Sequence, residues 1–190
     1  MIAPKTPFAW IALLSGAAVA VTLGVVLNSA IGARDLDVRP APEFTHRETS
    51  EWLNSEPLTL KQLKGRVVLL DFWTFDCWNC YRSFPWLKSV EERYGPQGLR
   101  VIGVHTPEFG HEKVLGNVQR KVEEFGLKHP VMVDSDMSYW RAMSNRYWPA
   151  YYLLDKRGNL RAYSVGETHA GDARAREIEA AVEKLLAEPG

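Results

Sequence analysis

Residues 66–80, RVVLLDFWTFDCWNC, join a run of apolar side chains to two closely spaced cysteines. The apolar run is short and follows Gly65, which is typical of a buried central strand. Cys77 and Cys80 are the only cysteines in the 190-residue chain. This count excludes a disulfide-rich scaffold, and the spacing at the end of a strand predicts one reactive dithiol unit.

The position of the two sulfurs indicates their roles. Cys77 is expected at the N-terminus of the following helix, where unpaired N–H groups and the helix dipole stabilise a thiolate. Cys80 lies one turn further on, within reach of a mixed disulfide. We therefore predict thiol–disulfide exchange, with Cys77 as nucleophile and Cys80 as resolving thiol. Half of a zinc site and an inert disulfide are the alternatives, but zinc needs four ligands and the five histidines are scattered.

Asp71 is an acid inside the apolar strand. Strand alternation places it on one face with Trp73 and Phe75. If it is buried near the dithiol, desolvation raises its pKa, and it can move a proton to or from Cys80 during resolution. A strand-end carboxylate that meets solvent or a backbone partner is the other interpretation, and the residues alone favour it slightly.

The rest of the chain alternates strand and helix patterns. Strands are expected over residues 99–105, 130–134, 150–155 and 160–165, and helices over 81–94, 111–125 and 137–146 and after Asp172. The last two strands form a hairpin with Gly-Asn at its tip. This order predicts a three-layer α/β domain with a central mixed sheet.

The N-terminal part has a different composition. No charged residue occurs between Lys5 and Arg34, a gap of 28 residues. Residues 8–27 form its apolar centre, and 20 helical residues span ~30 Å, the thickness of a bilayer core. We predict one transmembrane helix within an anchor over residues 1–34. A cleaved signal peptide is the alternative, because small residues at 30–32 offer a cleavage site.

Two further regions follow the anchor. Residues 35–45 carry two prolines and alternate charged with small side chains, so we expect an exposed tether. Residues 46–190 are expected to form the folded domain. The chain has 23 basic and 23 acidic residues and no basic block, which argues against a nucleic-acid partner. Flanking charges do not fix the orientation, but the cysteine chemistry favours an inner-membrane protein with its domain on the periplasmic, extracytoplasmic side.

Several motifs together resemble a known family. The stretch LLDFWTFDCWNC, followed by Pro85, resembles the active-site segment of thioredoxins. The closer similarity is to membrane-anchored, exported TlpA-like thioredoxins, and within them to the thioredoxin-like domain of DipZ-type cytochrome c biogenesis proteins. That subgroup is suggested by residues 72–80, 103–109 and 147–159, and the resemblance covers roughly residues 40–188.

The resemblance implies roles for individual residues. Pro149 matches the cis-proline that faces the Cys-x-x-Cys motif, so the backbone of Trp148 would pair with an incoming substrate strand. Asp71 matches the buried acid of thioredoxins, which reverses the preference stated above. Trp73 matches an aromatic core residue beneath the active site. The implied partners are an exported protein with a disulfide and a membrane thiol electron donor, and no metal or organic cofactor is required.

The sequence also departs from the family. The dipeptide Trp78-Asn79 is unusual there, and since it helps to set the redox potential, reductant versus oxidant stays open. Ser83 stands where some TlpA-like reductases carry a glutamate. Glu108 is either a nearby acid or, by our preference, a solvated loop residue.

Aromatic residues are abundant around the motif. Trp78 lies inside it, and we expect this side chain to be exposed and to form part of a docking surface for a partner protein. The aromatic side chains of Trp86, Trp140, Tyr147 and Trp148 are expected in the core.

Three other functions remain as alternatives. Thr74-x-x-Cys77 matches the Thr-x-x-Cys of a peroxiredoxin, in which Cys77 would be the peroxidatic thiol and Cys80 its resolver. A copper chaperone would use both thiolates with a distant imidazole such as His169. A non-enzymatic binding module would keep its function in Cys77→Ser.

Overall fold

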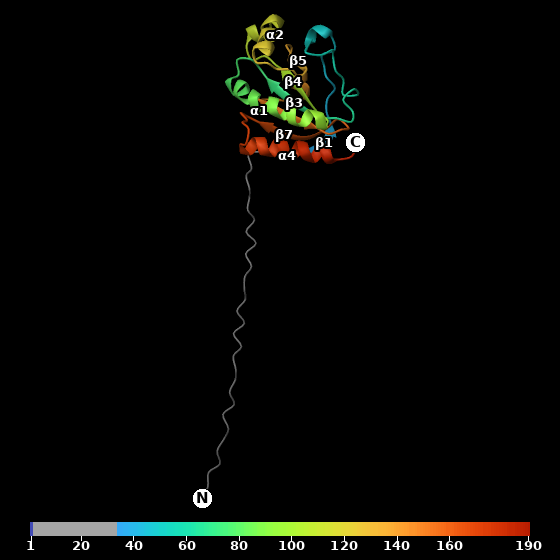
Figure 1. Cartoon of the computed structure of the whole chain (residues 1–190), viewed down its shortest axis with the longest axis vertical. Helices are drawn as coiled ribbons and strands as arrows, with labels where there is room; N and C mark the ends of the chain where they lie inside the picture. The colour runs from blue at the N-terminus through green and yellow to red at the C-terminus, as the bar shows by residue number, and fades with distance from the viewer. Residues whose placement is uncertain (2–33) are drawn as a thin grey trace. The chain divides into compact units, whose positions relative to one another are not determined.

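The computed structural model describes residue 1 and residues 34–190 (Figure 1). In chain order the elements are β1 (Arg34–Pro40), η1 (Thr49–Glu51), β2 (Trp52–Leu53), β3 (Val67–Trp73), α1 (Trp78–Tyr94), η2 (Gly95–Gln97), β4 (Leu99–His105), η3 (Gly110–Lys113), α2 (Leu115–Glu124), β5 (Val131–Val133), α3 (Ser138–Ala142), β6 (Ala150–Leu154), β7 (Asn159–Val165) and α4 (Ala173–Ala187).

The membrane segment predicted over residues 8–27 lies outside the described residues. Within the part of the chain that is described, no helix combines the length and apolar character that a bilayer crossing requires.

The strands form one seven-stranded mixed sheet in the order β1-β7-β6-β3-β4-β5-β2. Strands β3, β4 and β5 are parallel, and β6 pairs with β3 in the antiparallel sense. All seven residues of β3 are buried, because it has a strand on each side and a packed layer on each face. The predicted three-layer α/β fold with a central mixed sheet is therefore confirmed.

Two hydrophobic cores lie on the two faces of the sheet. The first packs Leu69 and Trp73 of β3 against buried side chains of α1, α2 and α4. The second packs Leu70 and Phe72 against α3 and the segment that leads to β2. Helices α1 and α4 lie side by side (Figure 1), and Trp86 Nε1 of α1 donates to Glu179 Oε1 of α4 at 2.9 Å.

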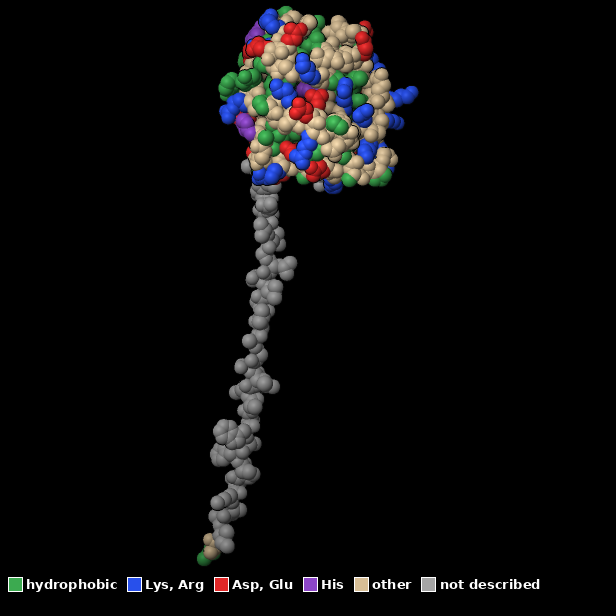
Figure 2. All heavy atoms as spheres, viewed as in Figure 1, with side chains coloured by type: hydrophobic (Ala, Val, Ile, Leu, Met, Phe, Trp, Pro, Cys, Tyr) green, Lys and Arg blue, Asp and Glu red, His purple; other side chains and the backbone are tan. Residues whose placement is uncertain are grey.

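Basic and acidic side chains are interspersed over the visible face of the domain (Figure 2). This mixed surface agrees with the balanced composition.

The segment before the domain differs from the predicted tether over residues 35–45. Residues 34–40 form β1, which pairs antiparallel with β7. The Ala41 N–H donates to the Gly158 carbonyl at 3.0 Å, and Phe44 is buried against Trp52. The outer edge of β7 offers unpaired backbone groups, so an extended segment can pair there whatever its side-chain pattern.

The helix predicted over residues 111–125 is also different. It is divided into η3 and α2, with Val114 in an extended conformation between them. Val114 and Leu115 are exposed at this division, although both are apolar. The division arises because the Glu112 side chain turns back and accepts the backbone N–H of Phe109, which closes a separate turn.

Candidate active site

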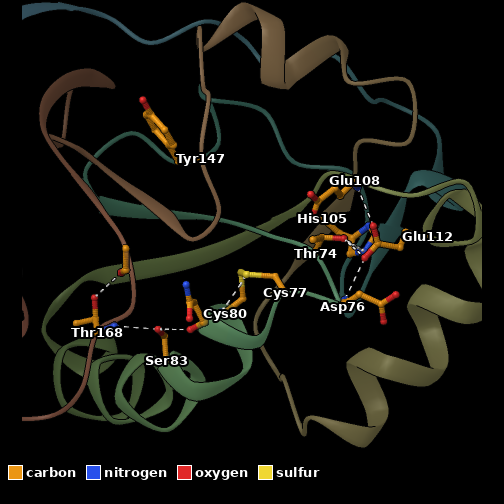
Figure 3. Close-up of a disulfide and its surroundings, with 12 residues drawn as sticks. Thr74, Asp76, Cys77, Cys80, Ser83, His105, Glu108, Glu112, Tyr147 and Thr168 are labelled. Atoms are coloured by element: carbon orange, nitrogen blue, oxygen red, sulfur yellow. Dashed lines mark hydrogen bonds between the residues drawn. A yellow bond between two sulfur atoms is a disulfide. The ribbon is translucent and has the colours of Figure 1, made fainter.

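The two cysteines form a disulfide at the junction of β3 and α1 (Figure 3). Cys77 is the N-cap of α1, and its Sγ accepts the backbone N–H of Cys80 at 3.1 Å. Cys77 is partly exposed, whereas Cys80 is buried. An incoming disulfide therefore meets Cys77 first, at a position where helix N–H groups stabilise a thiolate.

Asp71 is buried in the middle of β3. It alternates with Leu69 and Trp73, so it lies on the sheet face that packs against α1. Desolvation raises the pKa of Asp71 to about 8, and its Oδ2 has no hydrogen-bond partner. The carboxyl thus holds a proton near neutral pH, as a group that exchanges protons with a thiol requires.

The Trp148–Pro149 peptide bond is cis. Pro149 is buried, and its carbonyl accepts the Gly166 N–H of the β7 end at 2.9 Å. Trp148 is half-buried and packs against Trp140 in a tilted arrangement, with ring centroids 4.3 Å apart. The hydrogen bond of Pro149 and the ring contact of Trp148 together fix the loop before β6.

A surface hollow brings several predicted residues together. It is lined by Asp76, Cys77, Trp78, Asn79, Glu108, Arg146, Tyr147 and Trp148. The partly exposed sulfur of Cys77, the motif tryptophan and the residue before the cis-proline therefore border one depression. Asp71 and Pro149 are not among its lining residues.

An aromatic rim surrounds the nucleophile. Trp78 is 66% exposed and stacks on exposed Tyr81 with ring centroids 5.3 Å apart. Tyr147, which was expected in the core, is 55% exposed and lines the hollow with Cys77. Tyr147 lies in the loop between α3 and β6, next to half-buried Trp148, whose ring packs against buried Trp140.

The core aromatic beneath the site is Trp73. It is fully buried and makes edge contacts with Phe84 and His105, with ring centroids 5.4 and 4.9 Å apart. It occupies the core.

Ser83 and Glu108 also have defined places. The Ser83 hydroxyl is buried, donates to the Asn79 carbonyl at 2.7 Å and accepts the Thr168 N–H at 2.9 Å (Figure 3). The hydroxyl connects the first turn of α1 to the loop after β7. Unlike the glutamate that some TlpA-like reductases carry at this position, it has no charge. Glu108 is exposed at the rim of the hollow.

A buried polar cluster that the sequence did not predict lies on the side of the disulfide away from Ser83 (Figure 3). It consists of Thr74, His105 and Glu112, all buried. Thr74 donates its hydroxyl to Glu112. The sequence offers little signal for it, because a glutamate at 112 would indicate a capped turn only after a Ser, Thr, Asp or Asn, and position 109 is Phe.

Histidines do not join the cysteines in a metal site within the described residues. The group there with ligand-like spacing is His46, Asp134 and Asp136, which contains neither cysteine. His169, the imidazole of the copper alternative, is exposed and pairs with Glu167 at 2.5 Å.

A Cys-x-x-Cys disulfide at a strand–helix junction, a cis-proline and a buried acid on a mixed sheet define a thioredoxin-like thiol–disulfide oxidoreductase. The chain belongs to the Redoxin family, whose profile matches residues 38–182. This confirms the predicted thioredoxin-like family and the enzyme class.

Individual relatives agree with this assignment. Protein DipZ of Mycobacterium bovis is 43% identical over 169 residues, which cover 86% of this chain and 23% of DipZ. The chain therefore spans about a quarter of that relative's length. The thiol–disulfide oxidoreductase YkuV of Bacillus subtilis is 34% identical over 151 residues, or 79% of this chain and 96% of YkuV. The solution structure of a thioredoxin-like protein in its oxidised form has a TM-score of 0.67 and 32% identity, covering 80% of this chain and 98% of that one.

Proposed function

We propose that this oxidoreductase is a membrane-anchored reductase of protein disulfides that works on the extracytoplasmic side. The observation that carries the proposal is the asymmetry of the pair: Cys77 is partly exposed at the helix N-cap, and Cys80 is buried behind it. The uncharged segment 8–27 supports the anchor, because its length matches a bilayer core.

The reaction proceeds in two exchanges. The Cys77 thiolate attacks one sulfur of the client disulfide, forms a mixed disulfide and releases the other client sulfur as a thiolate. The Cys80 thiol loses its proton and attacks Cys77 Sγ, which breaks the mixed disulfide and forms Cys77–Cys80. The client has gained two electrons and, from solvent, two protons. Asp71 assists by exchanging a proton with Cys80, and a membrane thiol donor restores the dithiol.

Clients would bind across the hollow at Cys77. In the described part of the chain, no backbone hydrogen bond engages the N–H or carbonyl of Trp148, so both suit pairing with an extended client segment. The exposed ring of Trp78 offers apolar contact beside the sulfur. The resemblance to DipZ-type proteins extends the proposal to cytochrome c maturation, with apocytochrome c as a candidate client. The cycle uses two sulfurs and requires no metal or organic cofactor.

The test is insulin reduction by the full chain with dithiothreitol as electron donor. We expect turnover in the wild type and its loss in Cys77→Ser and in Cys80→Ser. Full activity in either variant would refute the dithiol cycle. Protease treatment of intact spheroplasts tests the location, since an extracytoplasmic domain is digested and a cytoplasmic one is protected.

The peroxidase alternative requires a threonine hydroxyl that is free to contact peroxide at Cys77. Thr74 is buried and donates its hydroxyl to Glu112. We therefore favour disulfide exchange. Hydrogen peroxide turnover that is lost in Cys77→Ser would restore the alternative.

A further inference from the structure

Glu112 is a buried carboxylate that joins the two loops at the edge of the active site (Figure 3). One loop connects β3 to α1 and carries Cys77. The other connects β4 to α2 and carries Glu108 and Phe109. The catalytic cycle described above does not use Glu112.

Both carboxylate oxygens are occupied by donors from these loops. Oε1 accepts the Thr74 hydroxyl and the Asp76 N–H, the latter at 3.0 Å. Oε2 accepts the N–H of Glu108 at 2.7 Å and that of Phe109 at 2.8 Å. Four donors to one carboxylate hold it in its ionised form.

The charge state follows from these bonds. Burial alone raises the pKa of Glu112, but the hydrogen bonds from the Thr74 hydroxyl and the backbone N–H groups bring it below its usual range. The side chain therefore carries a full negative charge at neutral pH. Because it is buried, solvent screens this charge weakly.

No buried cation balances this carboxylate among the described neighbours. His105 lies beside Thr74, its Nε2 3.5 Å from the hydroxyl, and desolvation lowers the pKa of His105 to about 4, so the ring is neutral. His111 and Asp76, which contact each other, are both exposed, as is Arg146 at the hollow. Solvent screens these exposed groups.

We propose that Glu112 is a positioning residue that fixes the loop before Cys77 and lowers the reduction potential of the Cys77–Cys80 pair. Asp76, held by Glu112, directly precedes the nucleophile. Reduction of the disulfide takes up two electrons and two protons, and Cys77 then loses a proton to become a thiolate. A fixed negative charge on Glu112, bonded to the N–H of the residue before Cys77, destabilises the thiolate of the reduced form and leaves the neutral disulfide unaffected, which favours oxidation of the pair.

This inference rests on the proposed function for its biological meaning, since a strongly reducing pair suits a reductase. The sequence left the direction open at Trp78-Asn79, and Glu112 supplies a physical reason for the reducing direction. The negative charge of Glu112 destabilises the Cys77 thiolate, whereas the N-terminus of α1 stabilises it, so the two effects partly cancel.

The experiment measures the dithiol–disulfide equilibrium of the full chain in glutathione buffers, read by acid quenching, thiol alkylation and intact mass. In Glu112→Gln we expect the equilibrium to favour the dithiol about tenfold more than in the wild type. This corresponds to a reduction potential that is about 30 mV higher, so the pair is more oxidising. The pKa of Cys77, read from thiolate absorbance, is expected to fall by about one unit. Glu123→Gln is the control, because it removes an exposed carboxylate of α2 that lines no hollow at Cys77, and it should shift the constant less than about twofold.

An unchanged equilibrium in Glu112→Gln, or an equal change in Glu123→Gln, would overturn the inference. Thr74→Val covers the case in which Glu112→Gln does not fold. This variant removes the hydroxyl donor to Glu112 and leaves the carboxylate charge in place. The reduction potential of the cysteine pair should therefore stay the same or become lower. A higher potential contradicts the proposal. The measurement uses no protein client, so inactivity toward insulin would refute the proposed function alone.

Discussion

The backbone N–H of Cys80 donates to the Sγ of Cys77 at 3.1 Å, so the first sulfur caps the helix that carries the second. This contact is available to a thiolate as well as to a disulfide sulfur. It places the negative charge of a reduced pair on Cys77 and leaves Cys80 as the buried partner.

We expect the reduced protein to be alkylated first at Cys77. At pH 6.5, iodoacetamide should modify Cys77 on the order of tenfold faster than Cys80, because the capped thiol has the lower pKa. Peptide mass mapping over a time course provides the rates. Equal rates at the two sulfurs, or faster reaction at Cys80, would disagree with the assignment of the nucleophile.

Asp71→Asn is expected to change both stability and resolution. The pKa of Asp71 is raised to about 8, so the folded protein binds this proton more tightly than the unfolded chain. The stability from the protonated form is complete below the ordinary pKa near 4 and is lost as the pH rises through about 8. The wild type should therefore lose on the order of 5 kcal/mol across this window, and Asp71→Asn much less.

Urea unfolding of the oxidised protein between pH 4 and 9 measures this slope. Parallel pH profiles for the wild type and Asp71→Asn would exclude a proton on the buried acid. Release of client from the mixed disulfide should slow by about 100-fold in the variant, as expected for a lost proton-transfer group. Resolution at the wild-type rate would remove Asp71 from the mechanism.

The sequence predicted the central elements well because their signals are local. Apart from Asp71 the run 67–73 is apolar, as a strand buried on both faces requires, and it forms β3. The Cys-x-x-Cys spacing located both sulfurs. The burial of Asp71, which the residues alone did not favour and the family resemblance implied, agrees with the structure.

The missed features depend on distant partners. β1 exists because β7 has a free edge, which no side chain of residues 34–40 indicates. Glu112 is polar within a polar run, and only the closure of two loops 36 residues apart in sequence buries it against Asp76. Tyr147 was misplaced because aromatic character alone does not distinguish a core ring from a rim ring.

His46→Gln should destabilise the protein in a pH-dependent way. The hydrogen bond to Asp134, with a further bond to Glu51, raises the pKa of His46 to about 9. Stability from protonated His46 is present below its ordinary pKa of 6.5 and is lost as the pH rises through about 9.

The variant should therefore lose about 3 kcal/mol at pH 6 and much less at pH 10, as measured by urea unfolding. An equal loss at both pH values would show that His46 contributes packing rather than a charged bond. Disulfide exchange at Cys77 should stay unchanged, since His46 is not among the residues that line its hollow.

Trp78→Ala should weaken client binding without unfolding the protein. The side chain is 66% exposed, so we expect a stability change within about 0.5 kcal/mol. If the ring docks a client, KM for insulin should rise severalfold while kcat changes little. Val38→Ala is the control, because it truncates an exposed apolar residue on β1. Equal KM values for wild type and Trp78→Ala would exclude a docking role for the ring.

The central claim is that Cys77 attacks client disulfides and Cys80 releases them. Its most direct test is trapping with the full-length Cys80→Ser variant, followed by non-reducing electrophoresis and mass spectrometry. We expect Cys80→Ser to accumulate adducts joined through Cys77 to exported proteins, and Cys77→Ser to accumulate none. The account is contradicted if Cys80→Ser yields no reducible adduct, or if Cys77→Ser traps the same proteins through Cys80.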